Sequence, residues 1–162
     1  GVDESLEGGP GRIVMMSSVA GEMAAPFLGP YSASKHAVEG LSKALRRELM
    51  LYGIQVVVIG PGAVATPIWA KAEEIDAEPY RETRFYDALL RIRGWMAKNG
   101  PEGFPPEKIA DRVFRSLTGD KPRLRYAIVP QRLTNWSLPK LLPGRLVDNM
   151  VAKRVGLQRK YR

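Results

Sequence analysis

The chain has 162 residues, with 25 Lys or Arg, 17 Asp or Glu, one histidine and no cysteine, and its formal net charge is +8. That length suits one domain with a buried core, and the composition is typical of a globular protein. The lack of cysteine excludes disulfides and thiolate zinc sites, and a single histidine excludes a histidine-rich site, so we expect no bound metal. No apolar run approaches the roughly 20 residues of a membrane span, and the lack of cysteine fits a reducing compartment, so we expect a cytoplasmic protein.

The positive charge is concentrated in the second half of the chain, whereas residues 1–80 carry more acidic than basic side chains. Such asymmetry is compatible with nucleic-acid binding, with contact to an anionic membrane surface, or with a solvated exterior. No helix-turn-helix, zinc-finger or aromatic stacking motif accompanies the charge, so we favour the solvated exterior and expect no nucleic-acid partner.

The first predicted elements are a flexible leading segment and a buried strand. Residues 1–11 contain the run Gly-Gly-Pro-Gly, which is typical of a flexible segment. Residues 12–18, RIVMMSS, form a nearly continuous apolar run, as expected for a strand buried on both faces of a parallel sheet. Residues 19–30 are rich in Gly, Ala and Pro and predict a loop.

The clearest predicted element is a helix over residues 31–52. Apolar residues recur in it at steps of three and four, and Gly53 stands where a left-handed helix stop is expected. The apolar residues that we expect to face the core are Ala37, Val38, Leu41, Leu45, Leu49 and Tyr52. A β-branched run, IQVVVIG, follows at 54–60 and predicts a second buried strand. Strand, helix and strand of these lengths imply a right-handed crossover with parallel pairing.

Shorter elements follow in the second half of the chain. The patterns predict helices at 68–76, 81–98 and 105–119 and a third strand at 125–130. This order of elements predicts an open α/β sheet with helices on both faces. Three strands are too few to give strands buried on both faces a neighbour at each edge, so we expect the chain to be the second half of a larger domain.

The start of the long helix carries a pair of side chains with chemical potential. Tyr31 and Lys35 are four residues apart and therefore neighbours on the helix surface. A phenol has an ordinary pKa of about 10, and a nearby ammonium favours its ionised form. The pair can therefore serve as a general acid and base at an alcohol or carbonyl oxygen. Tyr80 and Arg84 have the same spacing, so the pair by itself could also be a coincidence.

The predicted fold gathers polar residues at the same edge of the sheet as this pair. Ser17 and Ser18 end the first strand, and Pro61 and Gly62 follow the second. Ligands bind beyond the carboxyl ends of the strands in open α/β sheets. The convergence of these segments therefore favours a functional site over a chance spacing.

Three segments together resemble the catalytic half of the short-chain dehydrogenase/reductase family. They are IVMMSSVAG, then YSASK with its tyrosine 13 residues after Ser18, and VVVIGPGAVATP after the helix. The resemblance implies a fold class, the C-terminal half of a Rossmann-like, doubly wound parallel α/β sheet. It would occupy residues 12–130 and be incomplete without an upstream nucleotide-binding half.

The resemblance also implies an activity, that of an NAD(P)-dependent oxidoreductase interconverting a secondary or lipophilic alcohol and its carbonyl by hydride transfer. Tyr31 would be the acid and base at the substrate oxygen, and Lys35 would favour its ionised form and hydrogen-bond the nicotinamide ribose. Ser18 would stabilise charge on the substrate oxygen. The residues expected to contact the nicotinamide end of the cofactor are Pro61, Gly62, Val64 and Thr66, with Tyr31 and Lys35 also at the cofactor site.

The chain departs from the family pattern in its nucleotide-binding features. It contains no GxxxGxG turn and no Asn-Ala-Gly motif, and it lacks the residues that select NAD or NADP. We therefore leave the choice of dinucleotide open and expect these 162 residues to be inactive alone. Two other functions stay open: an inactive fragment that serves as an interaction module and, less favoured, a basic nucleic-acid-binding protein.

Residues 67–104 occupy the place of the family's variable substrate lid and are rich in large apolar side chains. We expect Ala25, Phe27 and Trp69 to line the substrate site. The resemblance is greatest to retinol- and steroid-type members, which implies a lipophilic alcohol or ketone. The same side chains could instead pack the lid against the body of the domain.

The last segment, residues 131–162, is a basic, leucine-containing extension in which Asp148 is the one acidic residue. It predicts an amphipathic helix that either lies on an anionic lipid surface or packs on the body with its basic residues outward, and we favour the second. In the family the helix that carries Tyr and Lys helps to build a dimer interface, which implies a homo-oligomer formed through helix 31–52.

Overall fold

The structure, a computed structural model, describes residues 11–72 and 74–158 of the chain. These residues form two compact bodies. The first contains residues up to Pro61 together with Ile109–Ile128, and the second contains Gly62–Lys108 together with residues from Val129 onward. Residues 1–10 of the predicted leading segment lie outside the described residues.

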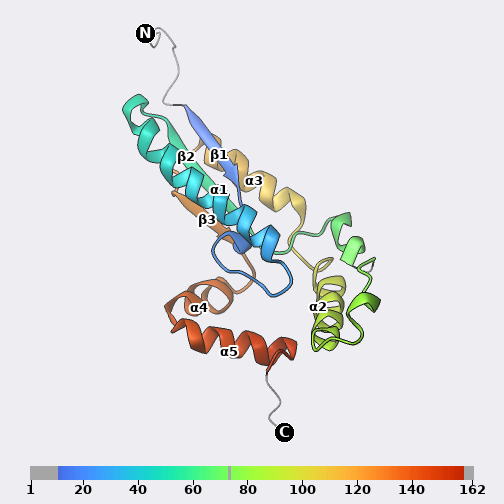
Figure 1. Cartoon of the computed structure of the whole chain (residues 1–162). Coiled ribbons are helices and arrows are strands. Elements are labelled where there is room, and N and C mark those ends of the chain that lie inside the picture. Colours follow the sequence, from blue (N-terminus) through green and yellow to red (C-terminus); the bar gives the residue numbers. More distant parts are fainter. Residues whose placement is uncertain (1–10, 73, 159–162) are drawn as a thin grey trace. The chain divides into compact units, whose positions relative to one another are not determined.

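The first body is built on a three-stranded, all-parallel sheet (Figure 1). Its strands are β1 (Arg12–Met16), β2 (Gln55–Pro61) and β3 (Arg125–Ile128), in the order β1-β2-β3. Arg12 pairs with Gln55 in the first ladder, and Val58 pairs with Arg125 in the second. The parallel pairing across the crossover confirms the α/β sheet that the sequence predicts.

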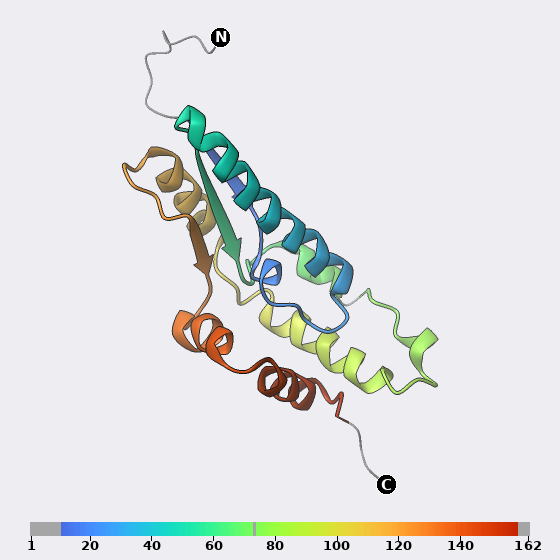
Figure 2. The ribbon, with the colours of Figure 1, turned by 60° about the vertical axis from the view of Figure 1, so that its left-hand side comes forward.

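The central strand β2 forms the core of this sheet. Its residues Val56–Ile59 are at most 1% exposed. A strand can bury successive side chains, which point to opposite faces, only when both faces of the sheet are covered. Helix α1 (Gly29–Glu48) covers one face of the sheet, and α3 (Pro106–Thr118), from Ile109 onward, lies on the other (Figures 1 and 2).

The buried face of α1 is polar, contrary to the apolar face that the sequence predicts. Ser32, Glu39 and Ser42 are its buried residues, whereas Leu41 is 53% exposed. The Ser42 hydroxyl donates to the Val38 carbonyl within the helix at 2.6 Å, so a small polar side chain can lie against the sheet without an unpaired hydroxyl. The expectation of a core position is therefore wrong for the exposed residues Ala37, Leu41 and Tyr52, whereas Val38, Leu45 and Leu49 are half-buried.

The element boundaries differ from the predicted ones by a few residues. Helix α1 begins at Gly29 because Pro30 is accommodated in its first turn, and residues Leu49–Tyr52 form a 3₁₀ turn that ends at Gly53 with a φ of 67°. The strand predicted at 12–18 ends at Met16, although the Ser17 N–H still donates to Ile59 at 2.8 Å. The strand predicted at 125–130 ends at Ile128.

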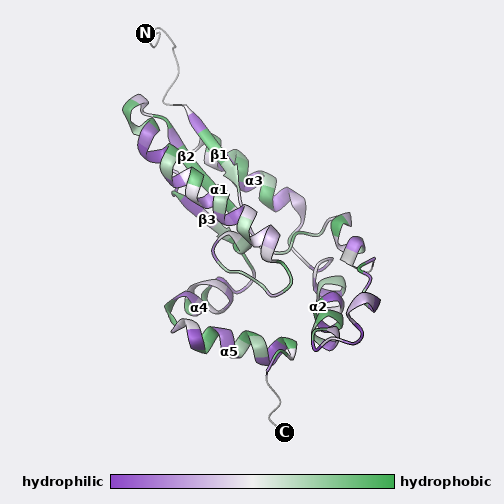
Figure 3. Ribbon diagram, in the orientation of Figure 1, coloured by the Kyte–Doolittle hydropathy of each residue, from purple (hydrophilic) through white to green (hydrophobic). Residues whose placement is uncertain are grey.

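The second body is mostly helical. It contains 3₁₀ turns at Pro67–Ala72 and Glu78–Tyr80, helix α2 (Tyr86–Asn99), a π-helical turn at Leu133–Ser137, α4 (Leu138–Leu141) and α5 (Gly144–Val155). The helix predicted at 81–98 thus begins five residues later, at Tyr86. Hydrophilic and hydrophobic bands alternate along α5 (Figure 3).

Close packing at glycines holds this second body together. Gly100 lies directly against the Trp69 indole, and Gly156, at a φ of 80°, lies against the Arg91 guanidinium. A side chain at either glycine would collide with these groups, so the backbone approach depends on glycine. Arg91 belongs to α2 and Gly156 caps α5, so these two helices are neighbours within the second body.

Within residues 11–72 and 74–158, no helix is both long and apolar enough to cross a membrane. The same residues contain no group of three or more His, Cys, Asp or Glu side chains arranged to hold a metal ion.

Candidate active site

Ser18 lies just beyond the carboxyl end of β1, where it begins the 3₁₀ turn Val19–Gly21. Its hydroxyl caps this turn by accepting from the Ala20 N–H at 3.2 Å, and it lies 3.4 Å from the Pro61 carbonyl, to which it donates. Ser17 and Ser18 are both buried. The hydroxyl of Ser18 is therefore held in one orientation at the edge where β1 and β2 end.

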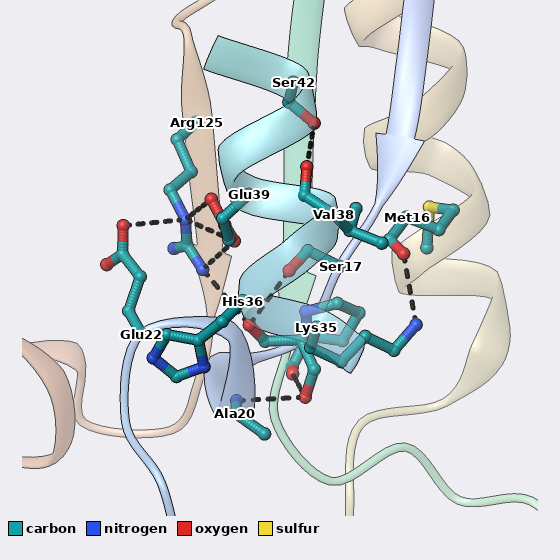
Figure 4. A network of polar contacts seen from close by, with 12 residues as sticks. Met16, Ser17, Ala20, Glu22, Lys35, His36, Val38, Glu39, Ser42 and Arg125 are labelled. Carbon is teal, nitrogen blue, oxygen red and sulfur yellow. Dashed lines mark hydrogen bonds and ion pairs between the residues drawn. The ribbon is translucent and has the colours of Figure 1, made fainter. Parts of the chain in front are cut away.

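Tyr31 and Lys35 stand in the first two turns of α1, at the same edge of the first body. The Tyr31 side chain is 45% exposed, and the Lys35 ammonium lies 5.8 Å from the centre of its ring. Lys35 also donates to the carbonyl of Met16, the last residue of β1, at 3.2 Å (Figure 4). The structure thus brings an accessible phenol, a cation and the end of β1 together, as the sequence predicts for neighbours on a helix.

The residues predicted for the nicotinamide end of a cofactor lie along the chain that leaves β2. Pro61 is the last residue of β2 and accepts from Ser18. Gly62, Val64 and Thr66 follow in the second body, where Val64 pairs with Phe104 in an isolated parallel bridge. The Thr66 hydroxyl is half-buried and donates to the Val64 carbonyl at 3.5 Å.

The three residues predicted to line a substrate site are in two different environments. Ala25 and Phe27 are exposed in the loop before α1, and Phe27 has a φ of 65°. Trp69 is half-buried in the second body, where its indole N–H donates to the Val64 carbonyl at 2.6 Å. Trp69 is thereby bonded to the segment predicted to contact the cofactor.

A buried ion-pair network beneath Ser18 was not predicted from the sequence. Arg125 of β3 donates from Nε and Nη2 to the carboxylate of Glu39 on α1, at 2.9–3.2 Å, and it forms an ion pair with Glu22 at 3.4 Å (Figure 4). The same Arg125 donates to the Ser18 carbonyl at 3.2 Å. The available signals were a charged residue inside an apolar strand pattern and a carboxylate one turn after Lys35.

Comparison with known proteins places these features in a family. The family model described as short chain dehydrogenase matches residues 2–77. The NADPH-dependent 3-dehydrocapnine reductase of Ornithobacterium rhinotracheale is 38% identical over 143 residues, which are 88% of this chain and 50% of that protein. The chain spans about half the length of the curated relatives it matches first.

Two solved structures share the fold. A short chain dehydrogenase/reductase of Burkholderia phymatum in complex with NAD aligns with a TM-score of 0.61 at 24% identity, over 93% of this chain and 50% of that one. A short chain dehydrogenase of Mycobacterium paratuberculosis bound to NAD aligns with a TM-score of 0.50 at 26% identity, over 74% of this chain and 44% of that one. These likenesses confirm the predicted Rossmann-like α/β fold class. The family match and the relatives show that the chain belongs to the short-chain dehydrogenase/reductase family.

Proposed function

We propose that the protein is an NAD(P)-dependent oxidoreductase that interconverts a secondary or lipophilic alcohol and its carbonyl by hydride transfer. The observation that carries this proposal is the arrangement at the end of β1. There the Lys35 ammonium lies 5.8 Å from the ring of an exposed Tyr31 and is anchored to the Met16 carbonyl.

Each of the three residues has a role that follows from its position. Tyr31 would give a proton to the substrate oxygen in reduction and accept it in oxidation, since its side chain is accessible from solvent. Lys35 would stabilise the negative charge that develops on the Tyr31 oxygen as the proton is transferred. Ser18, at the same edge of the sheet, would exchange its 3.4 Å hydrogen bond to the Pro61 carbonyl for one to the substrate oxygen as negative charge develops on that oxygen.

The residues present fit the nicotinamide end of a dinucleotide. The Lys35 ammonium carries three N–H donors, and Met16 accepts one of them, so Lys35 can also donate to a ribose hydroxyl. Gly62 would allow a close backbone approach, and the half-buried Thr66 hydroxyl could bond a carboxamide. The bound nicotinamide would supply or accept the hydride. One relative is named as NADPH-dependent and two structures hold NAD, which supports the cofactor class without selecting between NAD and NADP.

The substrate and the partners are further parts of the proposal. Large side chains in residues 67–104 and the exposed Phe27 favour a lipophilic alcohol or ketone. The exposed Leu41 supports a homo-oligomer formed through α1 and the 3₁₀ turn after it. The alternating bands of α5 are compatible with peripheral contact to a membrane surface (Figure 3).

Replacement of Tyr31 tests the proposed activity. Tyr31→Phe keeps the ring and removes the hydroxyl, so we expect kcat/KM for alcohol oxidation to fall by about 10² to 10⁴. Dinucleotide binding, followed by nicotinamide fluorescence, should persist. The matched control is Tyr52→Phe, which alters an equally exposed phenol beyond the end of α1 and should leave kcat/KM unchanged. A Tyr31→Phe protein with the kinetics of the wild type would contradict the proposed mechanism.

A further inference from the structure

Arg125 lies in a half-buried position that joins three elements of the first body. It comes from β3 and contacts Glu39 on α1 and Glu22, the residue that follows the turn Val19–Gly21 (Figure 4). The side chains of Arg125 and Glu39 are 17% and 4% exposed. An Arg–carboxylate pair with several N–H···O bonds has a defined geometry, so the network fixes the positions of α1 and β3 relative to the turn that Ser18 begins.

Two glycines leave room for the side chains of this network, Gly60 for Arg125 and Gly21 for Glu39. A Cβ added at Gly60 of β2 would collide with Arg125 and would lie 3.2 Å from the Ser18 carbonyl oxygen. A Cβ added at Gly21 would lie 2.9 Å from the Glu39 side chain. The guanidinium therefore lies against Gly60, near the carboxyl end of β2, and donates to both the Ser18 carbonyl and the Glu39 carboxylate.

Stability alone does not explain this arrangement. Replacing a buried ion pair with apolar residues of similar volume is often neutral or stabilising, because the desolvation of both charges opposes their attraction. The Ser18 carbonyl accepts from the Gly21 N–H at 3.1 Å and from Arg125 at 3.2 Å, and an apolar pair would remove the second of these two donors. Glu39 lies on the same helix as Tyr31 and Lys35, which stand in its preceding turns. The network therefore links the helix that carries Tyr31 and Lys35 to the backbone of Ser18.

We propose that Arg125 is a positioning residue that sets the orientation of Ser18 toward the substrate oxygen, with Glu39 and Glu22 holding its guanidinium. This inference rests on the proposed oxidoreductase function. A displacement of reacting groups by about 1 Å can lower a rate by about 10²-fold. Loss of the Arg125 bond to Ser18 should therefore reduce kcat while leaving KM nearly unchanged, since Arg125 itself touches no substrate.

The test is a double-mutant cycle in the full-length protein. Arg125→Met is combined with Glu39→Gln, so that no buried carboxylate is left without its partner, and the pair is measured with and without Ser18→Ala. In the presence of Ser18 we expect kcat to fall by about 10- to 100-fold. In the Ser18→Ala background we expect the same pair of changes to lower kcat by less than about threefold, because the group that Arg125 positions is already gone.

Arg12 provides the matched control. It also donates to backbone carbonyls, those of Ser116, Leu117 and Gly119, but it lies at the amino end of β1, away from Ser18. Arg12→Met should lower the melting temperature and leave kcat unchanged. Arg125→Lys keeps the charge without the planar fork, and it should restore folding of a destabilised Arg125 variant but not kcat.

The possible outcomes distinguish failure of the positioning role of Arg125 from failure of the proposed oxidoreductase function. Equal losses of kcat in the two backgrounds, or an equal loss in Arg12→Met, would mean that Arg125 acts through general stability and would overturn the inference alone. A full-length wild-type protein that transfers no hydride to any alcohol or carbonyl would overturn the proposed function and the inference with it.

Discussion

Phe27 adopts a backbone conformation that its own side chain disfavours. Its φ of 65° lies in the left-handed region, which costs an L-residue roughly 1–2 kcal/mol, and the side chain is 40% exposed. Such residues occur where the surrounding structure enforces the conformation, often beside ligands. A strained aromatic residue in the loop between Ser18 and Tyr31 is consistent with the substrate-lining role proposed for it.

Substitution of Phe27 by Gly and by Ala should separate the backbone from the side chain. Both changes remove the ring, but only Gly accepts a positive φ without strain, so we expect Phe27→Gly to be more stable than Phe27→Ala by about 1 kcal/mol. Urea unfolding measures this difference. At Ala25, which has no positive φ, Ala25→Gly should instead destabilise the protein by about 0.5 kcal/mol. Equal stability of the two Phe27 variants would contradict the strain.

Helix α1 buries polar side chains and leaves a leucine exposed to solvent. Ser32, Glu39 and Ser42 are buried, while Leu41 is 53% exposed. A helix that packs only on its own sheet usually turns apolar residues toward the sheet and polar residues toward solvent. The distribution in α1 is the pattern expected of a helix that meets a second copy of the chain.

Replacing Leu41 should therefore change assembly without changing the fold. Leu41→Glu places a charge on the proposed interface, and we expect the oligomer to dissociate in analytical ultracentrifugation. Leu117→Glu on α3 is the matched control, since Leu117 is 45% exposed in the same body and should not affect assembly. The proposed interface is wrong if both variants sediment as the wild type does.

The sequence predicts the type and order of the main elements but not how their side chains pair. Buried strands are recognisable from β-branched runs such as that of β2, and Gly53 marks the end of its helix. The contact between Glu39 and Arg125 joins residues that are far apart in the chain and leaves no local periodicity. A search for apolar periodicity therefore misses the buried polar residues of α1, Ser32, Glu39 and Ser42.

At the scale of the whole molecule, the positive charge of the last segment bears on the proposed contact with a membrane surface. Residues from Arg132 onward are strongly basic, and α5 ends with the exposed pair Lys153 and Arg154. If this region contacts anionic lipid, Lys153→Gln with Arg154→Gln should weaken pelleting with phosphatidylserine-containing vesicles, by about 1 kcal/mol per charge. Lys43→Gln with Arg47→Gln on α1 is the control and should have no effect. Equal pelleting with vesicles of phosphatidylcholine alone would contradict the contact.

The extent of the chain leads to a second prediction for the whole molecule. The 162 residues contain no glycine-rich dinucleotide turn and span about half the length of the first curated relatives. We expect a purified polypeptide of these residues to show no dinucleotide-dependent turnover, because the helix N-terminus that binds a pyrophosphate in such folds is not among them. Reduction of any ketone by this polypeptide alone would contradict the expectation.

The parallel pairing of the sheet has a consequence for how the chain folds. Arg12 pairs with Gln55, and Val58 pairs with Arg125, so neither ladder can start from a hairpin and each requires closure of a long loop. Such a high contact order predicts slow refolding. Of the three strands, β3 is synthesised last, so Glu39 cannot form its ion pair with Arg125 until β3 has been made. A folding intermediate that lacks β3 would therefore carry this carboxylate without Arg125.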